Sequence, residues 1–441
     1  SSTNCPMKST AGRIAPLLAL LLLPALLWPA PVSLAADSDT LRKRKVARTG
    51  GLSQRVYEQM QDIQQLIEED QVSEAQERLE DLQETKLTDY ERAQSWFLMG
   101  YVQFRKENFG AAQKAYERVL ASENLPLGLE TSVLKTLAQL SMVNENFDEA
   151  LSYLERLLAI SEKPQPDNYA LKAQVHYQME QYDLSMAALQ RAEQLAAERD
   201  EPPRESWLLL KNAIYYQRED FQGMLEVVQQ LVQLYPKDRY LLNMAAIYGE
   251  LGDSKKQLSL MEPLYERGSL TNETQKVNLA SLYMLNEIPF KAAVMLQQEL
   301  ASGDVETTHR HLEMLAQAWL LAANIENALE PLSRAAQLAD DGETYLTLAR
   351  TQMSLYRWRE AEQSARKALD KGGLRDTASG QLLLGMTLFN QKKYRDARSA
   401  FARAGEDPGT ERLANQWLTY LEREEEKQEL ARQAASPVPL Q

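Results

Sequence analysis

The chain has 441 residues, 63 Asp and Glu against 49 Lys and Arg, a net charge of −14 and 44% hydrophobic residues. This acidic balance argues against nucleic acid or an anionic membrane as the main ligand, because both require clustered cations. The single cysteine, Cys5, excludes a disulfide framework and a cysteine-based metal site, and the 18 glycines fall below the usual ~7%. An acidic and mostly helical chain remains.

Residues 1–36 are interpreted as an N-terminal extension followed by a signal peptide, with Met7 as the expected start. Lys8 and Arg13 form a basic region ahead of the apolar run Ile14–Trp28, and small residues follow it at the cleavage site. Prolines interrupt the run and disfavour a smooth spanning helix. We therefore expect Sec-type export and a periplasmic location.

A retained anchor is the alternative interpretation of the same segment. The stretch 14–36 is long enough to span a bilayer, and the basic residues 42–45 after it fit retention in the inner membrane. In that case the chain would face the periplasm and contact the membrane through this segment only. Residues 37–51 are expected to be a disordered basic linker.

A repeat of about 34 residues fills 52–409. Its clearest copy starts at Ala93, and its small residue at position 20 recurs through the chain in one register. Position 20 falls at Ala75, Ala112, Ala150, Ser185, Met224, Gln257, Ala292, Ala328, Ala361 and Ala397. Position 8 is small at Gly100, Ala138, Ala173, Ala245, Ala280, Ala316, Ala349 and Gly385.

This spacing has a physical cause. Small residues at positions 8 and 20 let two antiparallel helices approach closely, and large residues at positions 4, 11, 17 and 24 fill the remaining space. One hairpin cannot bury both of its faces, so hairpins stack into a continuous core. The pattern predicts an all-α solenoid, a right-handed superhelix of about ten helix-turn-helix repeats.

Weak copies of the repeat predict a local irregularity. Asn212 takes position 8 in the fifth copy, and Met224 and Gln257 take position 20 in the fifth and sixth. Larger groups at these close-packing points should widen the helix crossing, which predicts a bend within 205–260.

The segment 410–432 is predicted to be a capping helix, and 433–441 a disordered tail. Leu413, Trp417 and Leu421 form its apolar stripe, and a highly charged run follows them. A polar terminal helix is what a solenoid needs to end in water.

The search for catalytic chemistry finds no motif. His309 and His311 are two residues apart and lie on different sides of a helix, and His176 occupies a core position. No metalloprotease, nucleophile-elbow or phosphate-loop pattern occurs. We expect no enzyme activity, no cofactor, no metal and no small-molecule substrate.

Binding is expected in the concave groove lined by the first helix of each repeat. Aromatic anchors mixed with Gln, Lys and Arg suit an extended peptide or a partner helix. For Phe97, Phe104 and Tyr216 the alternative is a role in the core between repeats. The candidate groove residues are Phe97, Tyr101, Phe104, Arg105, Lys135, Gln139, Gln174, Tyr177, Tyr216 and Arg350.

These copies resemble tetratricopeptide repeats. More narrowly, the amino-acid sequences of five stretches resemble those of exported tetratricopeptide proteins encoded beside TonB-ExbB-ExbD energy-transduction components. The stretches are 54–60, 90–96, 234–237, 247–252 and 415–424. The resemblance implies a periplasmic accessory of TonB-dependent uptake of iron or another nutrient, with the TonB complex or a TonB-dependent receptor as partner.

Two other functions stay open. A scaffold for outer-membrane or cell-envelope assembly would use the same groove. The regulatory arm of an enzyme would need a catalytic domain on the chain, for which no long unassigned segment is present.

Overall fold

The computed structural model describes residues 51–435. All regular elements in this range are α-helices, labelled α2 to α22. The chain divides into two compact units between Asp220 and Phe221, inside the 205–260 segment of weak copies. The extension, signal segment and linker expected at 1–50 lie outside the described residues, as do 436–441.

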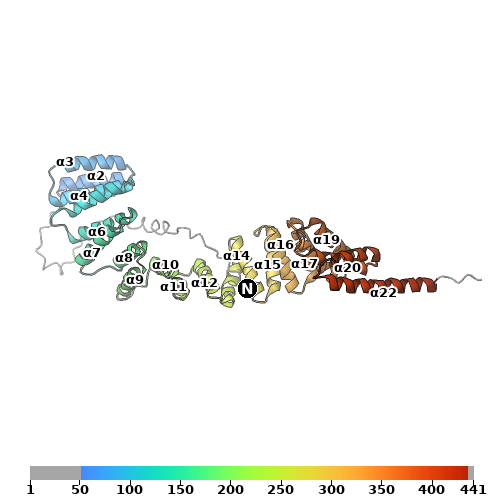
Figure 1. Ribbon diagram of the computed structural model, residues 1–441. Helices are drawn as coiled ribbons and strands as arrows, with labels where there is room; N and C mark the ends of the chain where they lie inside the picture. The colour runs from blue at the N-terminus through green and yellow to red at the C-terminus, as the bar shows by residue number, and fades with distance from the viewer. Residues whose placement is uncertain (1–50, 436–441) are drawn as a thin grey trace, which may run out of the picture. The chain divides into compact units, whose positions relative to one another are not determined.

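Unit 1, which ends at Asp220, is a series of antiparallel helical hairpins (Figure 1). A first and a second helix alternate, and each hairpin packs on the next. The first helices are α2 (Gln54–Glu68), α4 (Asp89–Arg105), α6 (Leu127–Val143), α8 (Pro166–Gln178) and α10 (Glu205–Gln217). The second helices are α3 (Val72–Glu84), α5 (Phe109–Leu120), α7 (Phe147–Ile160) and α9 (Tyr182–Ala197).

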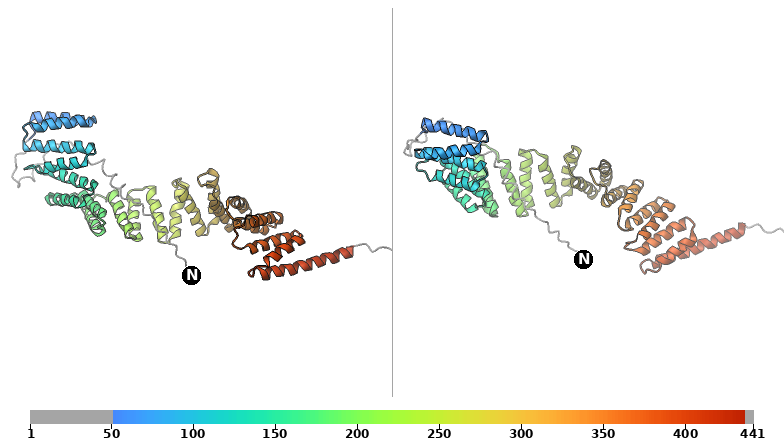
Figure 2. Two further views of the ribbon diagram at one scale, coloured as in Figure 1. Left: turned by 45° about the horizontal axis from the view of Figure 1, so that its top comes forward. Right: turned by 90° about the horizontal axis from the view of Figure 1, so that it is seen from above.

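Unit 2, which starts at Phe221, continues the same alternation, and Figure 2 shows its hairpins stacked side by side. Its first helices are α12 (Asp238–Glu250), α14 (Glu273–Leu285), α16 (His309–Leu321), α18 (Glu343–Ser354) and α20 (Thr377–Asn390). The second helices are α11 (Phe221–Leu234), α13 (Ser254–Glu266), α15 (Pro289–Ser302), α17 (Ile325–Leu338), α19 (Trp358–Lys371) and α21 (Tyr394–Ala404).

Every hairpin turn is built in the same way. One residue between the two helices takes the left-handed conformation, and the residue directly after it donates its N–H back to a carbonyl of the first helix. In the turn after α18, Tyr356 has φ 59° and the Arg357 N–H donates to the Gln352 carbonyl at 2.9 Å. This is a Schellman ending, which satisfies carbonyls that the helix end leaves free. The left-handed residues are Asp70, Glu107, Glu145, Glu180, Glu219, Gly252, Glu287, Ala323, Tyr356 and Lys392.

Size matching between positions 8 and 24 sets how closely the two helices of a hairpin pack. A Cβ on Gly100 would lie 2.7 Å from the Tyr116 ring, and one on Gly385 would lie 2.5 Å from the Phe401 ring. Glycine therefore occurs where the facing residue is aromatic. Alanine at position 8 pairs with a buried leucine in four other repeats: Ala138 with Leu154, Ala173 with Leu189, Ala280 with Leu296, and Ala316 with Leu332.

A buried carboxylate joins the first two repeats. Glu91, 3% exposed, accepts hydrogen bonds from the Ser53 N–H at 2.9 Å and hydroxyl at 2.6 Å, and from the Thr88 N–H at 2.9 Å and hydroxyl at 3.1 Å. Burial raises the pKa of Glu91, but these four bonds outweigh it and lower the pKa to about 2. The beginnings of α2 and α4 are thereby fixed to one another.

A second buried network joins α13, α14 and α15 in unit 2. The Lys276 ammonium donates to Glu299 at 2.6 Å and to Asp304 at 2.9 Å, and the Tyr265 hydroxyl donates to Glu299 at 2.6 Å. The Glu299 side chain is 6% exposed and that of Lys276 13%. The two charges of this buried pair depend on one another, because either charge alone would be costly to bury.

Helix α22 (Glu411–Ala435) ends unit 2. Ala414 and Leu421 are fully buried against the last hairpin, and the Trp417 ring stacks on Phe401 at 5.6 Å. Its exposed surface carries Asn415, Thr419 and Glu422 together with the apolar Leu413, Tyr420 and Leu430. The helix extends three residues beyond the predicted end at 432, because the charged run after Leu421 continues the helical pattern.

Candidate functional site

The predicted aromatic anchors of the second repeat are partly built into its core. The Phe97 ring meets Tyr116 edge to face at 5.6 Å, and the Phe104 ring lies 5.6 Å from Phe109. Both belong to the apolar cluster between the second and third repeats. Phe97 and Phe104 therefore have a packing role and offer only part of their surface to a ligand.

Tyr101 and Arg105 lie one turn apart on α4. A hydrogen bond with the Tyr101 side chain and the nearby Asp70 carboxylate raise the pKa of Arg105, against the effect of burial. The ion pair between Arg105 and Asp70 measures 2.7 Å and connects the second repeat to the first. Arg105 is exposed, so a partner could still reach its guanidinium.

Lys135 on α6 is half-buried and has no hydrogen bond or ion pair with another described residue. Burial lowers the pKa of Lys135, and Arg204 adds to this effect while Asp167 opposes it. The Asp167 carboxylate is already paired with Arg204 at 2.9 Å. Lys135 and Arg204 thus lie near one carboxylate that bonds only Arg204.

Two glutamine side chains on the first helices, Gln139 and Gln174, form with Lys135 what we call the first-helix row. Gln139 lies one turn after Lys135, and Gln174 occupies the same repeat position on α8. Both are half-buried and form no side-chain hydrogen bond within the described part of the chain. The Lys135 ammonium and these amides can therefore donate to a ligand without breaking an internal bond.

Tyrosines follow on α8 and α10. The Tyr177 ring packs on Tyr182 at 5.6 Å and remains half-buried. Tyr216 is 58% exposed, which leaves most of its ring available. The remaining predicted residue, the exposed Arg350, lies on α18 in unit 2.

Arg350 lies near the N-cap of the following repeat. Hydrogen bonds from Ser379 lower the pKa of Asp376, and the Arg350 charge adds to this. Met353 lies one turn after Arg350, and Met386 and Phe389 follow on α20 as half-buried apolar side chains. This face of unit 2 is more apolar than the row in unit 1.

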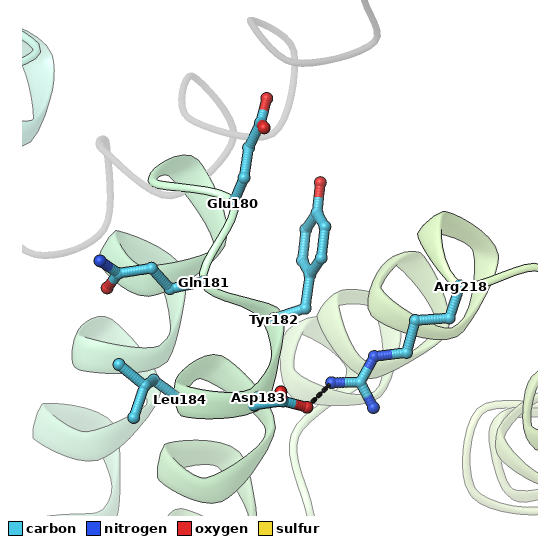
Figure 3. Close-up of a pocket in the computed structure, with 6 residues that line it drawn as sticks. All are labelled: Glu180, Gln181, Tyr182, Asp183, Leu184 and Arg218. Atoms are coloured by element: carbon cyan, nitrogen blue, oxygen red, sulfur yellow. Dashed lines mark hydrogen bonds and ion pairs between the residues drawn. The ribbon is translucent and has the colours of Figure 1, made fainter.

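A shallow open cavity of about 350 Å³ lies at the turn between α8 and α9 (Figure 3). Its lining includes Tyr182, Leu184 and an ion pair between Asp183 and Arg218. The Asp183 side chain is 97% exposed, and another Arg–Asp pair joins Arg105 to Asp70 in the first two repeats. The pair between Asp183 and Arg218 links the fourth repeat to the fifth.

The histidines have separate structural partners. His176 bonds Gln181 at 2.7 Å, His309 bonds Thr344 at 3.0 Å, and His311 bonds the Glu306 carbonyl at 2.8 Å. Within residues 51–435 no three His, Cys, Asp or Glu side chains are grouped to hold a metal ion. None of the helices in that range combines the length and apolarity needed to cross a bilayer.

Sequence reasoning missed two features beside the predicted residues. Asp167 and Arg204 lie close enough to Lys135 to affect its pKa. The two residues are about one repeat apart in the sequence, and this spacing could have indicated that they lie on neighbouring repeats. The exposed Tyr356 at a left-handed turn position was also missed, although it is the one aromatic residue among the ten.

Comparisons with known proteins agree with this architecture. One tetratricopeptide repeat model matches residues 97–164 and 346–410, and a second matches 166–199. No curated protein matches the chain.

Several solved structures are similar in fold. The tetratricopeptide protein YrrB, described as having an unusual peptide-binding site, is 17% identical with a TM-score of 0.35, covering 44% of this chain and 97% of its own. MamA from Desulfovibrio magneticus is 12% identical with a TM-score of 0.30, covering 36% and 90%. Naa15/Naa10 bound to HypK-THB is 14% identical with a TM-score of 0.42, covering 76% and 52%.

The chain therefore contains tetratricopeptide repeats, and the predicted fold, an all-α solenoid of such repeats with a terminal capping helix, is confirmed. Proteins of this fold act as scaffolds for protein–protein interaction.

Proposed function

We propose that the chain is a non-enzymatic scaffold that binds a segment of a partner protein along the first helices of unit 1. The observation that carries this proposal is the row formed by Lys135, Gln139 and Gln174. A half-buried ammonium that forms no ion pair of its own is unfavourable, and a ligand oxygen would reduce that penalty.

The row suits an extended main chain better than a compact ligand. Its three donors come from two neighbouring repeats, two from α6 and one from α8, so they could meet successive carbonyl or carboxylate oxygens of an extended segment. Tyr101, Tyr177 and Tyr216 add ring surface at both ends, and tyrosine is a residue type that often dominates binding energy at interfaces.

The partner that we propose is a component of a TonB-type transport system in the periplasm. The support is the resemblance of the five sequence stretches and the leader-like pattern of residues 7–36. Binding would be passive, with TonB, ExbD or a TonB-dependent receptor supplying the bound segment.

The test is affinity capture from periplasmic extract with tagged wild-type chain and with Lys135→Met. We expect wild type to enrich TonB, ExbD or a TonB-dependent receptor, and the variant to lose most of that enrichment. Lys163→Met, on an exposed loop, is the matched control and should capture as wild type does.

The possible results distinguish the scaffold function from the TonB assignment and from the choice of binding residues. Capture of envelope-assembly proteins that depends on Lys135 would keep the scaffold and replace the TonB assignment by the alternative. If the Lys135 variant captures as well as wild type at equal helicity, the assigned row is wrong.

A further inference from the structure

A basic and aromatic edge lies on unit 2, whereas the first-helix row belongs to unit 1. The segment 354–404 contains eleven Lys and Arg and five Asp and Glu, a net charge of +6 in a chain whose total is −14. Charge of opposite sign to the whole molecule, concentrated in two repeats, indicates a local electrostatic role.

The turns of the ninth and tenth repeats lie next to one another on this edge. The Gln391 amide donates to the Trp358 carbonyl at 3.1 Å, and Lys393 pairs with Glu362 at 2.6 Å. Arg357 pairs with Glu326 of the eighth repeat at 2.7 Å. These links hold the turn side chains in one continuous surface.

Three cations on this surface have no carboxylate in contact within the described residues. Arg359, Lys392 and Arg395 are all exposed and form no ion pair there. The neighbouring Arg357 pairs with Glu326 and Glu360, and Lys393 pairs with Glu362. Asp396, beside Arg395, is the one further acid of these two turns, so the three cations still outnumber it. The surface therefore keeps uncompensated positive charge.

Tyr356 is the most unusual residue of the edge. It is 77% exposed and adopts φ 59°, a left-handed conformation that is unfavourable for an aromatic side chain. The equivalent turn residues elsewhere are Asp, Glu, Gly, Ala or Lys. Its ring meets Trp358 edge to face at 5.7 Å, so one face remains open.

We infer that this turn edge, formed by Tyr356, Arg359, Lys392 and Arg395, binds an acidic segment of a partner protein. Carboxylates would pair with the three cations, and an apolar side chain would pack on Tyr356. Tyrosine, tryptophan and arginine are the residues that most often carry binding energy at interfaces. A strained and exposed tyrosine that packs on a single ring fits such an anchor.

A narrow peptide segment fits better than an anionic bilayer. Glu425, Glu426 and Glu429 of α22 lie beside Tyr394 at one side of the edge. A planar anionic surface would approach these carboxylates together with the cations, whereas a single segment can follow the cations alone. The inference does not depend on the first-helix row.

The experiment is selection of random displayed peptides of about twelve residues on the immobilised full-length chain. Peptides are then measured by fluorescence anisotropy against wild type, Tyr356→Gly and Arg359→Gln. Glycine suits a left-handed turn, so Tyr356→Gly should melt at or above the wild-type temperature and any loss of binding cannot come from unfolding. Glu287→Gly makes the same change at the equivalent turn of the seventh repeat and is the control.

We expect a class of peptides rich in Asp and Glu with one aromatic residue or leucine. Their affinity should fall at least about tenfold in Tyr356→Gly and in Arg359→Gln, and should stay unchanged in Glu287→Gly. Selected peptides that depend on Lys135 and not on Tyr356 would overturn this inference and leave the scaffold proposal intact. Tyr356-dependent sedimentation with phosphatidylglycerol vesicles, without acidic peptides, would overturn it in favour of a lipid surface.

Discussion

Replacing Gly385 by alanine tests the size matching between positions 8 and 24. The new Cβ would lie 2.5 Å from two carbons of the Phe401 ring, far inside van der Waals contact. Phe401 is fully buried and stacks on Trp417 with an angle of 13° between the rings, so the ring has little room to move.

The expected magnitude follows from two opposing terms. Overpacking a core costs roughly 1–3 kcal/mol, and exchanging glycine for alanine within a helix returns up to about 1 kcal/mol. We expect Gly385→Ala to destabilise the end of unit 2 by about 1–2 kcal/mol. The effect should be local, because each repeat contacts mainly its neighbours.

A second substitution, at Phe401, tests whether the loss in Gly385→Ala comes from contact with this ring. Phe401→Leu alone removes buried ring surface and should cost about 1–2 kcal/mol. Together, Gly385→Ala and Phe401→Leu recreate the alanine–leucine pair of four other repeats. The double variant should therefore be more stable than the sum of the single changes, with a coupling of at least about 1 kcal/mol.

Hydrogen exchange of the full chain is the suitable assay, because a repeat protein need not unfold in one step. Amides of α20, α21 and α22 should lose protection in Gly385→Ala and regain it in the double variant. Gly128→Ala, where no atom lies within 4 Å of the added Cβ, is the control and should not lose protection. Unchanged exchange in Gly385→Ala, or strict additivity, would refute the size-matching argument.

Three further predictions follow from the polar contacts. Lys276→Met should lower stability by about 3–5 kcal/mol, since Glu299 would remain buried without its cation, and adding Glu299→Leu should recover part of the loss in urea denaturation. Because the folded pKa of Glu91 is lowered to about 2, its stabilisation is complete above its ordinary value of 4.5 and is lost as pH falls towards 2. Glu91→Gln should therefore flatten melting temperature against pH in that window, and an unchanged profile would contradict the assignment. Asp183→Asn should change the melting temperature by no more than the equivalent of about 0.5 kcal/mol, because its ion pair is at the surface.

The repeat register could be predicted from sequence because close packing leaves little choice at a few positions. Ala75, Ala112 and Ala150 are fully buried, as the small position 20 required, and so is Ala138 at position 8. A side chain larger than alanine at such a point would separate the two helices. The same constraint acts in most copies, with Met224 and Gln257 as exceptions at position 20, so many weak signals add up to one strong pattern.

The polar networks could not be predicted in this way. Ser53 and Thr88 lie one repeat apart as the N-caps of α2 and α4, and Thr88 with Glu91 forms a capping box, but neither pattern shows that Glu91 also bonds Ser53. Lys276 likewise reaches Glu299 across a hairpin. The periodicity fixes which face of a helix is buried, but it does not fix which long side chain reaches which acid. The same limit applies to Phe97, whose position permits both core and ligand contact.

The candidate binding residues show the limit most clearly. Periodicity selected the first-helix face, but the absence of a partner for Lys135 emerges only from burial and from the ion pair between Asp167 and Arg204. The turn edge around Tyr356 could not be found by a search along one helix face, since turn residues lie outside the helical stripe.

Repeat architecture gives a last test that joins the two proposed surfaces. Lys135 lies in the third repeat and Tyr356 in the ninth, and each repeat is stabilised mainly by its neighbours. Substitutions at these positions should therefore act independently, and in Lys135→Met/Tyr356→Gly each class of selected peptide should lose only the affinity lost in its own single variant, within about 0.5 kcal/mol. Coupling above about 1 kcal/mol would contradict two separate surfaces, because it would require one ligand that engages both or a conformational change shared by distant repeats.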